Sequence, residues 1–244
     1  MRFKLTLEYD GGAFLGWQRV SQGLSVQGAL EEAIFKATGE RVEVQGAGRT
    51  DSGVHALGQV AHVDVAKHIA PGRLGDAINA LVRPAPVAVL EVREAAPDFH
   101  ARFNAVRRVY VYRISNRRSP LALDRGRCWR VPRELDVQKM QRAGQSLVGK
   151  HDFTTFRDAQ CQAKSPIKSL NVCDVKDAGE EVHVWCEAPS FLHRQVRSIV
   201  GTLVEVGVGR MTPMEVAAAL AARDRSRCGQ VAPPDGLYLV RVDY

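Results

Sequence analysis

The sequence lacks any long hydrophobic run. No stretch of its 244 residues approaches the roughly 18 consecutive apolar residues that can span a bilayer. The N-terminal residues Met1 to Leu5 enter an alternating pattern at once, so the sequence also predicts no signal peptide. We therefore expect a soluble protein without a membrane anchor.

Cysteine is scarce and odd in number. The five cysteines are irregularly spaced and include no C-x-x-C pair: Cys128, Cys161, Cys173, Cys186 and Cys228. This pattern is typical of reduced, mostly buried thiols in a cytoplasmic protein. It disfavours disulfides and a zinc site.

Acidic residues are fewer than basic ones. The chain has 27 Asp and Glu against 34 Lys and Arg, which gives a formal net charge of +7. A basic balance indicates an anionic partner, most often nucleic acid or a membrane surface. Arginine far outnumbers lysine, and its planar fork of five donors suits phosphate and base recognition. Charge alone leaves open a basic protein with no such partner.

Hydrophobic periodicity in the first part of the chain predicts six elements in the order β-α-β-β-α-β. They are a strand over Arg2–Tyr9, a helix over Ser25–Thr38, strands over Arg41–Gln45 and Gln59–Val65, a helix over Pro71–Val82 and a strand over Val87–Arg93. This order is the split βαβ, or ferredoxin-like, arrangement that the RNA-recognition module shares.

A similar order of elements follows in the second part. We expect a strand over Val106–Ser115, a helix over Asp136–Val148, a hairpin of Ile167–Val175 and Glu181–Ala188, a helix over Phe191–Val206, an extra helix that starts at Thr212 to Glu215 with a capping box, and a strand over Leu237–Tyr244. The sequence thus predicts an α+β protein of two halves, residues 1–104 and 105–244. The two halves are expected to be pseudo-symmetric.

One Gly-rich loop, residues 46–56, carries an acid and a base between two predicted strands. Asp51 is its only acid, and Arg49 lies two residues earlier. A nearby guanidinium favours the ionised carboxylate, which suits a nucleophile or a base. An ordinary solvated hairpin is the alternative, because Gly and Asp dominate turns.

Known phosphate-binding loops do not fit this stretch. A dinucleotide fingerprint that starts at Gly46 needs glycine where Asp51 stands. The nearest candidate for a P-loop, Gly11 to Gly16, is followed by Trp17 where lysine is required. Nucleotide binding is therefore disfavoured.

Two further segments combine basic and aromatic side chains. Alternation places Arg108, Tyr110 and Tyr112 on one face of a strand, where the tyrosines either stack on bases or belong to the core. On a helix, Arg194 and Arg197 are neighbours at i, i+3. These arginines either bind phosphate, pair with a carboxylate, or form a solvated basic face.

The Asp51 loop resembles the signature of the tRNA pseudouridine synthase A (TruA) family. Further matching blocks extend nearly from end to end: Glu8 to Gly11, Gly16 to Gln18, Ser25 to Gln27, Asp98 to Phe103, Arg108 to Tyr112, His151 to Thr154, Phe191 to Leu203 and Gly236 to Leu239. The resemblance implies two RRM-like βαββαβ halves, a mainly antiparallel mixed sheet, and a catalytic cleft between the halves.

The resemblance also implies residue roles. Asp51 is the expected nucleophile, Tyr110 the base-stacking tyrosine, and Arg49 and Arg197 the catalytic arginines. Arg108 and Arg194 are expected substrate contacts; Arg19 and Arg107 are further basic residues able to contact phosphate. Two departures from the family pattern occur: Ser52 stands where alanine is usual, and His193-Arg194-Gln195 where a basic pair and methionine are common.

The implied reaction is isomerisation of uridine to pseudouridine at positions 38, 39 and 40 of the tRNA anticodon stem-loop. The expected partners are tRNA and a second copy of the chain, in a cytoplasmic homodimer. Neither a cofactor nor a metal is expected. Two alternatives remain: a non-catalytic RNA-binding module, and a metal hydrolase that uses Asp51, His55, His62 and Asp64.

Overall fold

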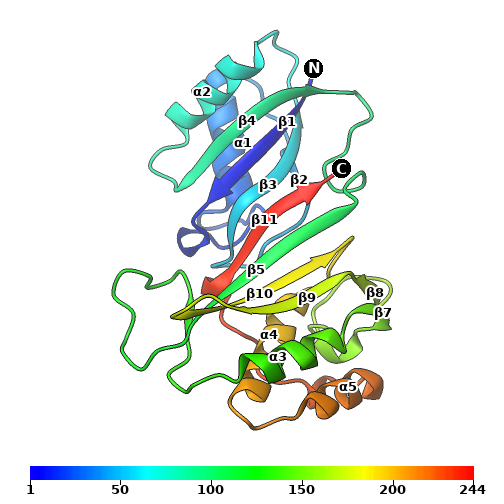
Figure 1. Cartoon of the computed structure of the whole chain (residues 1–244). Helices are drawn as coiled ribbons and strands as arrows, with labels where there is room; N and C mark the ends of the chain where they lie inside the picture. Colours follow the sequence, from blue (N-terminus) through cyan, green and yellow to red (C-terminus); the bar gives the residue numbers. More distant parts are fainter. The chain divides into compact units, whose positions relative to one another are not determined.

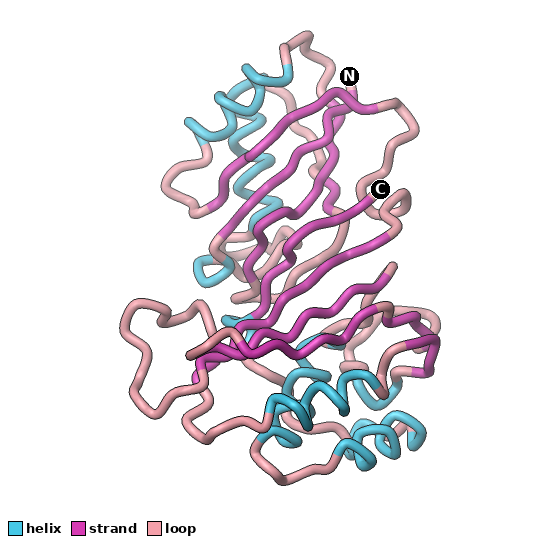
Figure 2. Tube along the Cα trace, in the orientation of Figure 1, coloured by secondary structure: helices cyan, strands magenta, loops and turns pink.

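The computed structural model describes residues 1–244 as two compact units (Figures 1 and 2). Unit 1 contains Met1–Val106 together with Tyr238–Tyr244, and unit 2 contains Arg107–Leu237. The assignment of functions to halves 1–104 and 105–244 stays a prediction. No helix in the structure is both long and apolar enough to cross a membrane.

Unit 1 is a sheet with two helices against one face (Figure 1). Its elements are β1 (Arg2–Tyr9), α1 (Val26–Thr38), β2 (Gln45–Gly46), β3 (His55–Asp64), α2 (Pro71–Leu81), β4 (Val87–Ala95) and β11 (Leu237–Asp243). The strand order is β4-β1-β3-β11, and β2 also pairs with β3. All pairs are antiparallel except β3 with β11. The predicted β-α-β-β-α-β order is confirmed.

The core of unit 1 lies between this sheet and its helices. β1 alternates strictly, so Phe3, Leu5 and Leu7 are fully buried from one face. α1 begins where Ser25 Oγ accepts the amide of Gly28. It ends at Gly39, whose φ of 81° is the left-handed conformation that glycine adopts without strain.

Two strand predictions in unit 1 need correction. Residues 41–44 form no strand, and only Gln45 and Gly46 pair with β3. The amide of Val44 donates instead to Glu31 Oε1 at 2.9 Å, so a buried side chain replaces a sheet partner. β3 begins at His55 rather than at Gln59, and this places the end of the Asp51 loop inside a strand.

Unit 2 also combines strands with helices against one face (Figures 1 and 2). Its elements are β5 (Arg107–Ser115), β6 (Trp129–Arg130), α3 (Val137–Gln145), β7 (Gly149–Asp152), β8 (Ile167–Leu170), β9 (Val172–Asp177), β10 (Glu181–Ala188), α4 (Gln195–Gly207) and α5 (Pro213–Ala222). β10 pairs antiparallel with β5 and β9, β6 pairs parallel with β5, and β7 with β8 forms a separate antiparallel pair.

The order of elements repeats between the units. In unit 1, β3 pairs with both β1 and β2; in unit 2, β10 pairs with both β5 and β9. One helix follows the first strand of each set, and another follows the third. The predicted α+β class, with mixed but mainly antiparallel pairing and a pseudo-symmetric repeat, is confirmed.

Three boundaries in unit 2 differ from the predictions. α4 begins at Gln195, not at Phe191, because Arg194 has a left-handed φ of 57° that interrupts the helix. The predicted strand over 167–175 is divided at Asn171, whose amide donates to Glu187 O at 2.7 Å. Gly149 starts β7, while α3 already ends at Gln145.

The predicted capping box of α5 is confirmed. Thr212 Oγ1 accepts the amide of Glu215, and the Glu215 carboxylate accepts the amide of Thr212 at 2.7 Å. Pro213 occupies the first helical turn, where its missing N–H costs nothing.

Candidate active site

The Asp51 loop is fastened to the body of unit 1 by backbone hydrogen bonds. The amide of Ala47 donates to Val60 O at 2.7 Å, and the amide of Trp17 donates to Thr50 O at 3.0 Å. Within the loop, the amide of Val54 donates to Asp51 O at 3.2 Å and closes a turn. The backbone that carries Asp51 is therefore bound on both sides.

A chain of buried side chains supports the loop from below. Thr50 is 7% exposed, and its hydroxyl lies 2.9 Å from the hydroxyl of Tyr9. The amide nitrogen of Gln59 donates to Gly48 O at 2.9 Å and to the Tyr9 hydroxyl at 3.3 Å. Burial raises the pKa of Tyr9 to about 12, so this phenol stays a neutral hydrogen-bonding group.

Two glycines outside the loop allow its close approach. A Cβ on Gly11 would lie 2.1 Å from Val54 O, and one on Gly16 would lie 2.7 Å from Thr50 O. Gly16 also has a φ of +100°, which L side chains rarely adopt. A side chain at either glycine would push the loop away from the sheet.

The charged residues of the loop lie at its surface. Asp51 is partly exposed and Arg49 is exposed, while their neighbour Thr50 is buried. The role of Arg49 as a partner of Asp51 stays a prediction. The carboxylate of Asp51 is partly exposed, its backbone is anchored, and the exposed guanidinium of Arg49 is two residues away. Such a carboxylate can act on an anionic ligand as nucleophile or base.

His55 is a structural residue of the site rather than an exposed acid or base. It is 3% exposed, and its ring stacks on Tyr238 with centroids 4.6 Å apart. Its Nδ1 accepts the amide of Gly11 at 3.0 Å and lies 3.2 Å from a carboxylate oxygen of Asp10. His55 thus joins the end of the Asp51 loop to β11 and to the segment after β1.

Sequence reasoning missed the buried carboxylate of Glu31. Its Oε1 accepts Gln27 Nε2 and the amide of Val44, each at 2.9 Å, and its Oε2 pairs with Arg19. Glu31 therefore ties α1 to the segment after Trp17 and to the segment that enters the Asp51 loop. The available sequence signal was a polar i, i+4 pair, Gln27 and Glu31, on the buried face of a helix.

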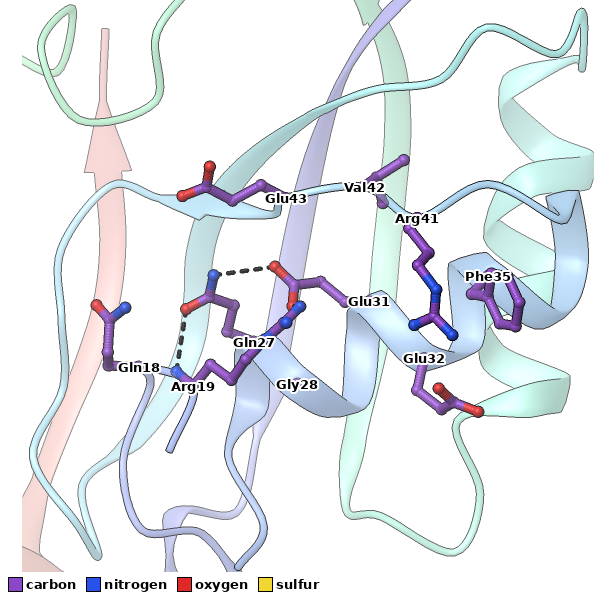
Figure 3. A pocket seen from close by; sticks show the side chains of 10 residues that line it. All are labelled: Gln18, Arg19, Gln27, Gly28, Glu31, Glu32, Phe35, Arg41, Val42 and Glu43. Carbon is purple, nitrogen blue, oxygen red and sulfur yellow. Dashed lines mark hydrogen bonds and ion pairs between the residues drawn. The ribbon is translucent and has the colours of Figure 1, made fainter. Parts of the chain in front are cut away.

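Glu31 borders an open pocket of about 660 Å³ (Figure 3). The pocket is lined by Gln18, Arg19, Gln27, Gly28, Glu31, Glu32, Phe35, Arg41, Val42 and Glu43. Arg41 lies over the ring of Phe35 at 4.6 Å, and Arg19 is paired with Glu31. Three glutamates disfavour a phosphate there, so we assign this region to support of the loop.

In unit 2, the two tyrosines of β5 have different environments. Tyr112 is fully buried, and its hydroxyl donates to Pro233 O at 2.8 Å, as the core interpretation predicted. Tyr110 is only half-buried, and its ring meets Phe191 edge to face at 5.3 Å. Tyr110 is therefore the tyrosine of this strand that keeps exposed ring surface.

Arg197 is held in the first turn of α4. Its Nε donates to Ala232 O at 2.8 Å, and the amide of Ala232 donates to Arg197 O at 3.1 Å. This pair of bonds fixes the direction of the side chain. Arg108 is 9% exposed, and its guanidinium donates to Pro189 O at 2.5 Å.

Arg194 lies outside the helix, so its predicted i, i+3 relation to Arg197 is wrong. It is 40% exposed and pairs with Asp158 at 3.0 Å. Partial burial opposes ionisation of Asp158. The amide of Gln160 and the charges of Arg194 and His193 outweigh that effect and lower the pKa of Asp158.

The metal-site alternative required several ligands to converge. No group of three or more His, Cys, Asp or Glu side chains is arranged to hold a metal ion. His62 Nδ1 accepts the amide of Ala101 at 3.2 Å, and burial lowers the pKa of His62. Asp64 forms two hydrogen bonds with Arg2, at 2.8 and 2.6 Å.

Comparison with known proteins gives a consistent result. The family model described as tRNA pseudouridine synthase matches residues 6–104 and 143–244. A tRNA pseudouridine synthase A from Rhodopseudomonas palustris (strain HaA2) is 62% identical and covers 100% of this chain and 99% of its own length. Proteins of the same name from Maricaulis maris (strain MCS10) and Parvibaculum lavamentivorans (strain DS-1) are 59% and 57% identical; both cover 100% of this chain, and 98% and 99% of their own lengths.

The chain belongs to the tRNA pseudouridine synthase family. It is accordingly an RNA-modifying isomerase. The resemblance drawn from the Asp51 loop and its accompanying blocks is confirmed at this level.

Proposed function

We propose that this protein isomerises uridine to pseudouridine at positions 38, 39 and 40 of the tRNA anticodon stem-loop, with Asp51 as its catalytic carboxylate. Family membership supports the reaction class. The observation that carries the residue assignment is the Asp51 loop, where a partly exposed carboxylate stands on a backbone bound to Tyr9, Trp17 and Val60 through neighbouring residues.

The chemistry is a rearrangement within one nucleotide. The target uridine leaves its stack, at a cost of a few kcal/mol, so that its sugar and base become accessible. The N1–C1′ bond breaks, the base turns, and a C5–C1′ bond forms. The C5 hydrogen leaves as a proton and N1 gains one. Atoms and electrons balance without an oxidant or a reductant.

Asp51 either attacks the nucleotide or removes a proton from its sugar, and both roles need an ionised carboxylate. Arg49, exposed two residues away, supplies positive charge beside it. Arg197 is the second catalytic arginine. Its bond to Ala232 O holds its side chain in one direction.

Tyr110 stacks on the flipped uracil. Its half-buried ring, fixed edge to face by Phe191, loses little freedom when a base covers it. Stacking returns roughly 1–3 kcal/mol per base, which offsets much of the flipping cost.

The two further arginines differ in exposure. Arg194, which is 40% exposed, contacts substrate phosphate. Arg108 is buried and bound to Pro189 O, so it supports the Tyr110 strand rather than the RNA directly. We also propose that the protein acts as a homodimer in the cytoplasm, on the basis of the family resemblance, and sedimentation velocity tests the dimer.

The test is tritium release from tRNA that carries 5-tritiated uridine, in the presence of EDTA. Isomerisation expels the C5 hydrogen, so the wild-type protein should release tritium. Asp51→Asn should release none and still bind tRNA. Asp76→Asn removes an exposed carboxylate on α2 and serves as the matched control, with wild-type release.

Each outcome has one meaning. Release by Asp51→Asn would show that the catalytic residue is misassigned. No release by the wild type, with tRNA still bound, would support a non-catalytic RNA-binding module. Tritium release that occurs without EDTA and is abolished by EDTA would show that the reaction needs a metal ion.

A further inference from the structure

The loop after β5 concentrates positive charge. Residues 117–133, here called the arginine loop, contain six arginines: Arg117, Arg118, Arg125, Arg127, Arg130 and Arg133. Asp124 is their only acid, so 17 residues carry a net charge of +5 out of +7 for the whole chain. The loop lies between the two segments that the family model matches, residues 6–104 and 143–244.

Hydrogen bonds join the two ends of the arginine loop. β6 pairs with the end of β5 through Ile114 and Trp129, and the amide of Val131 donates to Ser115 O at 2.9 Å. Asn116 Nδ2 donates to Val131 O at 2.9 Å and to Arg133 O at 2.6 Å. Long loops in compact proteins are uncommon, and ordered ones are frequently functional.

The interior of the loop is also fixed. Cys128 is 4% exposed, and Trp129 meets the buried ring of Tyr112 edge to face at 6.2 Å. Asp124 Oδ1 lies 3.5 Å from Arg113 Nη2 on β5. The loop's only acid therefore faces an arginine of the strand, Arg113.

Three arginines of the loop have no partner for their guanidinium groups. Arg118, Arg125 and Arg133 are exposed, and none forms a side-chain hydrogen bond or ion pair. Arg117 pairs with Glu180, which is 77% exposed, and such surface pairs contribute little. Exposed guanidinium groups concentrated in one segment create a positive potential that attracts anions.

The chemistry of the loop selects its ligand. A guanidinium presents a planar fork of donors that matches phosphate oxygens, and RNA offers phosphates in a row. A second copy of this chain would bring the same positive loop and a net positive surface. An acidic polyanion fits these observations better than a protein of this charge.

We propose that the arginine loop is an RNA-binding surface that contacts tRNA phosphates away from the nucleotide that reacts. The proposal rests on the proposed function, since it takes tRNA as the partner. The loop supplies affinity through Arg118, Arg125 and Arg133, and it takes no part in the chemical step.

The experiment compares two variants that each lose three exposed positive charges. The test variant is Arg118→Gln/Arg125→Gln/Arg133→Gln. The control variant is Arg73→Gln/Arg83→Gln/Lys150→Gln, whose sites are exposed and lie outside the loop. Binding of full-length tRNA is measured by fluorescence anisotropy from about 0.05 to 0.3 M salt, and turnover by tritium release.

The test variant should bind about tenfold more weakly at 0.15 M salt, and its slope of log affinity against log salt should fall by roughly two to three. Its kcat at saturating tRNA should equal that of the wild type, while KM rises. The control variant should keep the wild-type slope to within about one. Thermal unfolding of both variants checks that the fold is retained.

The alternatives give different readings. Equal slopes of log affinity against log salt in the test and control variants would overturn the loop proposal. They would not affect the proposed isomerase function. A change in sedimentation of the test variant without a change in slope would make the loop a protein interface. Absence of tritium release by the wild type would refute the proposed function, and the slopes would still decide whether the loop binds RNA.

Discussion

At the scale of single residues, the site separates charged groups from their neutral support. Asp51 and Arg49 are at the surface, while Thr50, Tyr9 and Gln59 below them are neutral hydrogen-bonding groups. Because the pKa of Tyr9 is raised to about 12, no charge forms under the loop at physiological pH. Neutral hydrogen bonds from Thr50, Tyr9 and Gln59 therefore help to hold the loop in place.

The carboxyl group of Glu181 should make the stability of the fold depend on pH. Hydrogen bonds from Arg113 lower the pKa of Glu181, and His183 adds to the effect. A folded-state pKa below the unfolded value of about 4.3 stabilises the fold above that pH, and the stabilisation disappears as pH falls through the folded value. Glu181→Gln should thus cost stability at pH 7 and little at acid pH.

Urea denaturation of the wild type and of Glu181→Gln at a series of pH values measures this effect. The neighbouring Glu180, 77% exposed, provides the control variant Glu180→Gln, with a small difference at every pH. A Glu181→Gln difference that does not shrink at acid pH would contradict the assignment.

At the scale of elements, α1 supports the segments that lead into the Asp51 loop. Glu31 is 5% exposed and accepts hydrogen bonds from Gln27 and from the backbone of Val44. Arg19 is its ion-pair partner. The side chain of Glu31 therefore holds the segments of Arg19 and Val44, whose conformations local propensity does not determine. Figure 3 shows Glu31 with Arg19 and Gln27.

Removal of this carboxylate should be costly. Glu31→Ala leaves buried donors without an acceptor, and we expect a loss of about 2–4 kcal/mol of unfolding free energy. Glu31→Gln keeps one acceptor oxygen and should cost less. Chemical denaturation measures both variants.

The adjacent Glu32 provides the matched control. It is 56% exposed and pairs only with Lys36 at 3.4 Å, so Glu32→Ala should cost under about 0.5 kcal/mol. Equal losses of unfolding free energy for Glu31→Ala and Glu32→Ala would show that the buried hydrogen bonds of Glu31 stabilise the fold no more than an exposed ion pair does.

At the scale of the whole molecule, the last residues of the chain complete unit 1. β11 pairs parallel with β3 through Tyr238 and Leu239, and Leu239 is fully buried. A Cβ on Gly58 would lie 2.5 Å from Val240 O, so the two strands approach closely. Residues 183 positions apart thus pair in one sheet next to the Asp51 loop.

Deletion of residues 237–244 should destabilise unit 1. Tyr238 and Leu239 would lose burial worth roughly 1.5–3 kcal/mol each, and His55 would lose its stacking partner. Hydrogen exchange at the amides of β3 measures the effect, with Arg241→Ala, 49% exposed, as the control. Unchanged protection of β3 would show that β11 is dispensable.

Features that depend on local chemistry could be predicted from the sequence. Alternation fixed β1 and β5, caps at Ser25 and Thr212 fixed two helix starts, and the Asp51 loop identified the family. These features need only neighbouring residues, so a single sequence carries them.

The remaining features could not be predicted from the sequence, because they depend on partners that are distant in the chain. Residues 41–44 alternate like a strand, yet Glu31 takes the hydrogen bond that a strand would have taken. Tyr110 and Tyr112 read alike on one face, yet only Tyr112 is covered completely. Burial and hydrogen-bond partners are properties of the folded chain, and they determine which of two similar residues keeps exposed surface.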